Sequence, residues 1–244
     1  NFFYLLFMEY ACGHYLMQYY DKKVPIVLDN TSNKCLVIIE TRPSFWLPLV
    51  IKNAVDKCPG YNLYVFGTPN VNQFLRHTLE GEYYNITINT YMRNIQEYNH
   101  LLTSSDFWEQ IKEEHIIIFQ LDTLFLRNPT ERHMQYDYNG AVCGKLNREN
   151  EFTINGGLSY RSKKAMLFAC KLIDDSYHGL PEDVIFTKLM RKHNELFKLP
   201  SIADCNDFSI ETLGNFDNVI GIHGTDKYYI LDKSIYQLLM KTKV

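Results

Sequence analysis

The chain has 244 residues, of which 46% are hydrophobic, and its formal net charge at pH 7 is −3. This hydrophobic content excludes a disordered chain, and the length suits one sizeable α/β domain that buries its core without disulfide or metal staples. The small net charge gives no overall attraction for nucleic acid or anionic membranes, so we expect any anionic ligand to be met by a local site.

The organisation of the chain predicts one main domain after a short leading segment. Residues 1–34 are expected to form an N-terminal helical and connector segment, the end of a preceding region, and residues 35–244 the main domain. Six cysteines without a C-x-x-C pair are typical of a reducing compartment. The sequence has no run of ~18–20 apolar residues, which is the length needed to span a membrane. We therefore expect a cytoplasmic protein without a transmembrane segment.

The first half alternates apolar runs with segments of helical spacing. Consecutive apolar residues, many of them β-branched, are typical of strands that are buried on both faces. The predicted strands are 35–39, 61–68, 84–88 and the one that begins at His115, and the predicted helices are 45–58, 71–79 and 95–114, with Ser105 as a cap in the last. Such alternation is the signature of βαβ units in a parallel sheet.

The second half changes to strands that are separated by long polar intervals. Strands are predicted at 138–143, at 152–161, around Ile210 and at 219–223, and helices at 162–174, 181–193 and 230–241. The fold class expected for the whole is α/β, with a mostly parallel, Rossmann-like central sheet flanked by helices and mixed strands in the second half.

Gln120 and Asp122 follow the most apolar predicted strand directly. Open α/β sheets bind ligands just outside the carboxyl ends of their strands. The spacing Gln-x-Asp points both side chains to one side of an extended chain, where a carboxylate can hold a divalent cation and an amide can add a neutral oxygen. The simpler interpretation is that Asp122 caps the following turn.

Gly156 and Gly157 interrupt another predicted strand. Glycines weaken a strand unless backbone or ligand must come close. A sugar or its phosphate lying against the two glycines would explain them, and a β-bulge explains them equally well.

Glu182 and Asp183 follow Pro181 at a predicted helix start. Acidic residues there complement the helix dipole and cap free N–H groups, which is the simpler interpretation. The functional interpretation is that one carboxylate faces a cleft and accepts a proton from an incoming hydroxyl.

Three further residues could meet a charged ligand. His223 ends an apolar strand beside Gly224, and His paired with a carboxylate suits Mn²⁺ or a similar ion, although a lone His is more often structural. Lys227 could meet phosphate oxygens as a point charge. Arg42, at the end of the first strand, is a second candidate cation, unless it forms only a surface ion pair.

The order of these elements resembles the GT-A class of nucleotide-sugar glycosyltransferases. The motifs of several other enzyme classes, G-x-S-x-G, G-x-x-x-x-G-K-[ST] and H-E-x-x-H among them, are missing from the sequence. In GT-A enzymes a D-x-D motif, a G-G strand, an E-D pair and a late His occur in this sequence order. More narrowly, the segments 38–43, 119–122, 156–161 and 182–184 are similar to an uncharacterised glycosyltransferase-like domain family of bacteria and giant viruses.

The resemblance implies a donor site and a metal site. Donor binding falls to the residues that match the motifs, namely Glu40, Thr41, Arg42, Gln120, Asp122, Gly156, Gly157 and Lys227. Asp122 and His223 would hold Mn²⁺ or Mg²⁺. Gln120 departs from the family pattern because it replaces the first Asp of D-x-D and removes a charge. The cation is then weakly bound or dispensable, with Lys227 and Arg42 carrying the diphosphate.

The resemblance also implies a reaction. A nucleotide-sugar donor, of UDP type first, would pass its sugar to a hydroxyl of a glycan or protein acceptor with inversion, and Asp183 or Glu182 would act as the base. We also expect a homodimer. If the protein is viral, its expected location is the host cytoplasm. The alternative is a degenerate module that binds sugar or nucleotide, or that serves assembly within a larger protein.

Overall fold

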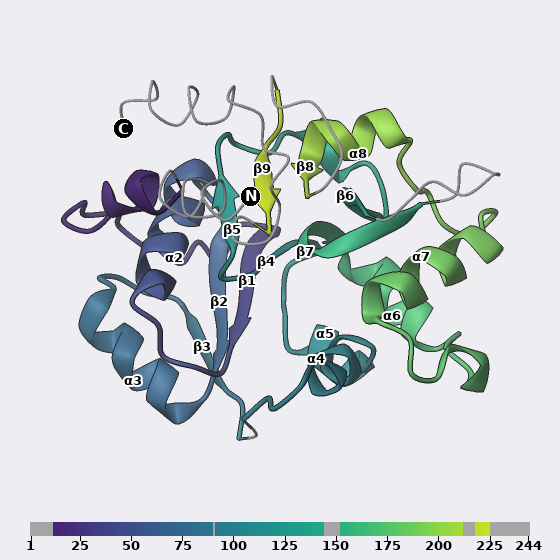
Figure 1. The fold of residues 1–244 in the computed structure, drawn as a ribbon, viewed down its shortest axis with the longest axis horizontal. Coiled ribbons are helices and arrows are strands. Elements are labelled where there is room, and N and C mark those ends of the chain that lie inside the picture. The colour runs from purple at the N-terminus through teal and green to yellow at the C-terminus, as the bar shows by residue number, and fades with distance from the viewer. Residues whose placement is uncertain (1–11, 90, 144–151, 212–217, 225–244) are drawn as a thin grey trace, which may run out of the picture.

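The computed structural model describes residues 12–89, 91–143, 152–211 and 218–224 (Figure 1). A six-stranded sheet in the order β3-β2-β1-β4-β7-β6 forms its centre. Its strands are β1 (Lys34–Glu40), β2 (Asn62–Gly67), β3 (Tyr84–Thr87), β4 (His115–Phe119), β6 (Tyr138–Cys143) and β7 (Thr153–Ser162). The first four strands are parallel, and β7 is antiparallel to both of its neighbours. The prediction of a mostly parallel sheet with mixed strands in the second half is confirmed.

Helices cover both faces of this sheet (Figure 1). One face packs against α2 (Trp46–Lys57) and α3 (Pro69–Thr78). The other packs against α4 (Ile95–Leu102), α5 (Ser105–Glu109), α6 (Lys163–Cys170) and α7 (Glu182–Lys192). The described elements also include α8 (Ile202–Phe208) and two short 3₁₀ turns, Glu131–Met134 and Asp175–Tyr177.

Alternate side chains of β1 explain why this strand is apolar from Cys35 to Ile39. Leu36 and Ile38 lie in the core on the α2 side, whereas Cys35 and Val37 lie in the core on the α5 side. Because successive side chains of a strand point to opposite faces, only a continuous apolar run can fill both cores. Residues 12–17 are helical, and Tyr15 joins the α2 core. Whether a domain boundary falls at residue 34 stays a prediction.

A second, small sheet lies beside the first and has the order β5-β9-β8. It consists of β5 (Thr123–Phe125), β8 (Ser209–Ile210) and β9 (Gly221–His223). Strand β5 was not expected, because three residues are too few to show a strand period. Asn53 of α2 holds it from the core: its amide accepts from the Phe125 N–H at 2.8 Å and donates to the Phe125 carbonyl at 3.0 Å.

Two predicted helices have different bounds in the structure. The segment expected to be helical from 95 to 114 forms α4 and α5, and the cap of α5 is Ser104 rather than Ser105, because the Ser104 hydroxyl accepts from the Asp106 N–H. Helix α6 ends at Cys170 rather than at Asp174, which caps the next turn instead. The predicted helix at 230–241 lies outside the described residues. Within the described part of the chain, no helix has the length and apolar character needed to cross a membrane.

Candidate functional site

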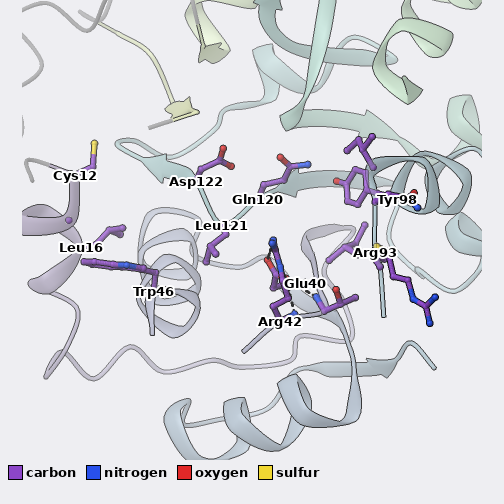
Figure 2. A pocket seen from close by; sticks show the side chains of 16 residues that line it. Cys12, Leu16, Glu40, Arg42, Trp46, Arg93, Tyr98, Gln120, Leu121 and Asp122 are labelled. Atoms are coloured by element: carbon purple, nitrogen blue, oxygen red, sulfur yellow. Dashed lines mark hydrogen bonds and ion pairs between the residues drawn. The ribbon is translucent and has the colours of Figure 1, made fainter. Parts of the chain in front are cut away.

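A cavity of about 820 Å³ lies over the carboxyl ends of β1 and β4. Figure 2 shows Gln120 and Asp122 on one side of it and Glu40 with Arg42 across from them. Its wall consists of Cys12, Gly13, Leu16, Ile39, Glu40, Thr41, Arg42, Trp46, Met92, Arg93, Asn94, Ile95, Tyr98, Gln120, Leu121 and Asp122. Because parallel strands end at one edge of the sheet, residues about 80 positions apart in the sequence meet here.

The segment after β1 forms a tight turn around a buried carboxylate. Oε1 of Glu40 accepts the N–H groups of Thr41 and Arg42, each at 2.8 Å, and the Nε of Arg42 at 3.1 Å. The side chain of Arg42 is 66% exposed, whereas that of Glu40 is 8% exposed. Glu40 therefore serves to fix the turn, and Arg42 presents a cation to the cavity. The simpler interpretation of Arg42 was an ion pair, and the structure shows one, with Glu40 in the cavity wall.

Gln120 and Asp122 meet at His223, although not by strand alternation. Strand β4 ends at Phe119, and the Thr123 N–H closes a turn onto the Gln120 carbonyl at 3.1 Å. This turn brings Oε1 of Gln120 to 3.1 Å and Oδ1 of Asp122 to 3.3 Å from Nε2 of His223. The two side chains expected to share one side of an extended chain thus share one histidine.

A second carboxylate, which the sequence did not indicate, faces the other nitrogen of His223. Oε1 of Glu211 lies 3.6 Å from Nδ1, and both residues are buried. Burial by itself would lower the pKa of His223, but hydrogen bonding and negative charge from Asp122 and Glu211 outweigh it and raise that pKa to about 9. The two carboxylates thus favour the protonated imidazole when no metal is bound.

The two glycines of β7 make room for side chains on opposite faces of the strand. A Cβ at Gly156 would lie 2.1 Å from Oε1 of Glu182 and 2.7 Å from an Nη of Arg161. A Cβ at Gly157 would lie 2.0 Å from Nε2 of His223. Since real Cβ atoms do not approach so closely, each glycine is needed for its neighbour. Donor contact at the two glycines stays a prediction.

Glu182 is bound to a buried arginine rather than open to the cavity. Both of its oxygens accept from the guanidinium of Arg161 at 2.9 Å, and Arg161 is fully buried. The guanidinium carbon lies 4.8 Å from the ring centroid of Tyr138 and 5.6 Å from that of Phe186, so the pair is enclosed by aromatic rings. A carboxylate that is paired in this way is poorly placed to take up a proton.

Asp183, the next residue, has a raised pKa. Burial, followed by the negative charge of Glu182, raises the pKa of Asp183 to about 6, although Oδ1 accepts from the Val184 N–H at 2.8 Å. Asn99 of α4 accepts from the Glu182 N–H at 3.3 Å and so links the start of α7 to the helix that carries Tyr98 in the cavity wall. Asp183 itself is not among the side chains that line the cavity. Lys227 lies outside the described residues.

The residues around His223 could hold a divalent cation in place of the proton on Nε2. In the described part of the chain, His, Cys, Asp and Glu side chains alone form no group of three that could hold a metal. The third donor here is the amide oxygen of Gln120, next to Oδ1 of Asp122 and Nε2 of His223. The distances of 3.1 and 3.3 Å from Nε2 to these two oxygens are those of direct polar contacts, and they are also compatible with the separation of roughly 3 Å between neighbouring ligands of an octahedral ion with bonds of about 2.1 Å. Oxygen ligands suit both Mn²⁺ and Mg²⁺, and the one imidazole favours Mn²⁺ of the two.

Comparison with solved structures supports the fold. The crystal structure of mouse xyloside xylosyltransferase 1 in its apo form is similar, with a TM-score of 0.56 at 12% sequence identity. The match covers 78% of this chain and 97% of that one. The chain therefore has the mixed α/β, GT-A-like fold that its sequence predicted. No curated protein matches the sequence.

One family model matches residues 83–223, which is more than half of the chain. The matched segment contains Gln120, Asp122, Asp183 and His223, and it begins after the Glu40 turn. It shows that the chain belongs to the family described as "Protein of unknown function (DUF5672)".

Proposed function

We propose that the protein is a glycosyltransferase that moves a sugar from a nucleotide-sugar donor to a hydroxyl acceptor. One observation carries this proposal: the cavity at the carboxyl ends of β1 and β4 brings the Arg42 guanidinium and the oxygens of Gln120 and Asp122 together. Cations and oxygen ligands at this edge of an open α/β sheet suit a diphosphate and its counter-ion. The likeness in fold to a xylosyltransferase is consistent with this proposal.

Within this proposal, Gln120, Asp122 and His223 would hold Mn²⁺ or Mg²⁺. The bound cation would supply positive charge against the leaving nucleoside diphosphate. Arg42 lies across the cavity from Gln120 and Asp122 and is placed to meet phosphate oxygens from the other side. Lys227, predicted to do the same, keeps that role as part of the proposal.

The base in this proposal is Asp183 rather than Glu182. Asp183 takes the proton of the acceptor hydroxyl, whose oxygen forms a bond to the anomeric carbon as the bond from that carbon to the diphosphate breaks. One displacement of this kind inverts the configuration of the sugar. The pKa of about 6 suits a base that is ionised at neutral pH, whereas the Glu182 charge is already matched by Arg161. We therefore expect transfer to increase as the pH rises through about 6.

A second function, binding of sugar or nucleotide without transfer, is favoured by one observation. Gln120 lacks the charge of an aspartate, and its oxygen already contacts His223 at 3.1 Å. The UDP type of the donor, the glycan or protein acceptor, the homodimer and the cytoplasmic location stay predictions.

A thermal-shift screen of nucleotide sugars of UDP, GDP, dTDP and CMP types, with and without Mn²⁺, tests the proposed function. A ligand at about a hundred times its dissociation constant adds roughly 2.7 kcal/mol, which corresponds to a shift of several degrees. We expect a shift with one base, followed by sugar transfer to water or to a hydroxyl acceptor. Asp122→Asn should weaken the Mn²⁺-dependent part of the shift. Donor binding by a protein that transfers no sugar would favour the binding module, and no shift with any donor would overturn both functions.

A further inference from the structure

We infer that Glu211 is a positioning residue: its carboxylate lies 3.6 Å from Nδ1 of His223 and, as the negative charge behind the ring, keeps Nε2 directed, as a metal ligand, at Gln120 and Asp122. This inference deepens the proposed function and depends on the cation site within it. Glu211 lies in the segment Ser-Ile-Glu-Thr, which carries no motif, and the charge it brings to the site is visible only in the fold.

The small sheet places Glu211 opposite Asp122. Strand β9 runs between β5 and β8, so His223 has a neighbour on each side. On one side Thr123 pairs with His223, directly after Asp122. On the other side Ile210 pairs with Ile222 in parallel register, so the next residue of each strand, Glu211 and His223, lie side by side. The register of two short strands thus aims one carboxylate at each nitrogen of the ring.

The chemistry of imidazole determines which ring nitrogen can bind a metal in this arrangement. A neutral imidazole has one N–H and one lone pair, and a metal takes the lone pair. A carboxylate behind the ring retains the N–H on the far nitrogen, which orients the ring and makes the near nitrogen a better ligand. Glu211 faces Nδ1 at 3.6 Å, and the ligand oxygens face Nε2 at 3.1 and 3.3 Å. In the metal-free ring Nε2 already lies at hydrogen-bond distance from Gln120 and Asp122, so a cation would take the place of the Nε2 proton while the Nδ1 proton stays facing Glu211. Without Glu211, the Nδ1 proton loses the negative charge that faces it.

Burial of the pair strengthens the effect. His223 is 4% exposed and Glu211 is 5% exposed, so water competes weakly for the contact between them. Gly157 fixes the remaining freedom of the ring. The Cβ built on Gly157 would lie 2.0, 2.3 and 2.4 Å from Nε2, Cε1 and Cδ2, which places the strand backbone over the face of the imidazole rather than along the Nε2 lone pair.

Mn²⁺ binding to the full chain without nucleotide provides the test. Electron paramagnetic resonance of free Mn²⁺ gives the dissociation constant of each variant, and no substrate is needed. We expect Glu211→Gln to weaken Mn²⁺ binding by about 10- to 100-fold, the usual effect of losing such a partner of a ligand. Glu211→Asp retains the charge and should restore part of the affinity. Glu80→Gln, at an exposed carboxylate, is the matched control and should bind as wild type does.

Thermal unfolding without metal separates positioning from a purely structural role. If Glu211→Gln lowers the melting temperature severely, the Mn²⁺ affinity of Glu211→Asp is compared with that of wild type instead. A positioning role requires that a folded Glu211 variant still binds Mn²⁺ more weakly than wild type. Equal Mn²⁺ affinity of the glutamine variant and wild type would overturn the inference. Absence of Mn²⁺ binding by a wild-type protein that still binds a nucleotide sugar would overturn it too, while leaving the proposed function in place.

Discussion

Gly157 of β7 and His223 of β9 are in such close contact that a methyl group on the glycine would lie 2.0 Å from the imidazole Nε2. The backbone of the long strand is therefore the surface against which the histidine packs. Gly156 has the same relationship to Glu182 on the other face of the strand. Two adjacent glycines thus serve two different sites.

Substitution of the two glycines should therefore have different consequences. We expect Gly157→Ala to displace His223, to cost about 1–3 kcal/mol through overpacking and to weaken Mn²⁺ binding at least 10-fold. Gly156→Ala should cost a similar amount because it displaces Glu182, but it should leave Mn²⁺ affinity within about 3-fold of wild type. Urea unfolding and Mn²⁺ titration of both variants check this. A Gly157→Ala protein with unchanged Mn²⁺ affinity would contradict the arrangement at His223.

Arg161 and Glu182 form a buried ion pair, and removing only one of the two should lower the stability of the protein strongly. Glu182→Gln leaves the Arg161 charge uncompensated in the core, which we expect to cost about 3–5 kcal/mol in urea unfolding. The double variant Arg161→Met with Glu182→Leu should cost clearly less than the sum of its single changes, because both charges are then gone. An exposed glutamate, Glu80, changed to Gln should leave the unfolding free energy nearly unchanged. Additive effects of the two single changes would show that the ion pair does not couple them.

Asp183 should make the protein less stable as the pH rises. Its pKa is raised from the ordinary 3.8 to about 6, so the folded protein holds this proton more tightly than the unfolded chain does. Ionisation of Asp183 therefore costs stability progressively between about pH 4 and 6, and the cost is fully present above that range. Asp183→Asn removes the cost, so we expect the variant to be more stable than wild type by about 1–2 kcal/mol at pH 8 and equal to it near pH 4.

Unfolding by urea at pH 4, 6 and 8 measures this difference without any substrate. Asp21→Asn, at an exposed position, is the control and should follow the wild-type pH dependence. The same Asp183→Asn protein should lose sugar transfer if Asp183 is the base. Full transfer by a folded Asp183→Asn protein would remove that assignment.

Arg42 should affect ligand binding far more than folding. Its side chain is 66% exposed, and Glu40 retains the two N–H groups of the turn when the guanidinium is removed. We expect Arg42→Ala to leave the melting temperature nearly unchanged and to weaken nucleotide-sugar binding by about 10-fold or more, as expected for the loss of a charged hydrogen bond to phosphate. Titration of the donor found in the screen checks this, with Arg76→Ala on α3 as the control. Equal donor affinity would show that Arg42 belongs only to the Glu40 turn.

The sequence by itself determined the main sheet and most of its helices. Runs such as 35–39 and 115–119 must be buried on both faces, and the helical spacing between them requires parallel strands, so the cavity edge with Arg42, Gln120 and Asp122 followed from local pattern. His223 was found because it ends such a run. These features depend on periodicity within one segment, which a sequence displays directly.

Only the tertiary structure decided the partners of these residues. In the sequence Arg161 is one residue of a predicted strand, and only the structure shows that it is buried against Glu182. Glu211 belongs to no sequence pattern, and the pairing of the two-residue strand β8 with β9 places it beside His223. The short strand β5 and the turn at Gln120 were likewise set by contacts with α2 and β9. Register between distant strands and the cost of burying an unpaired charge select these partners, and neither leaves a local period in the sequence.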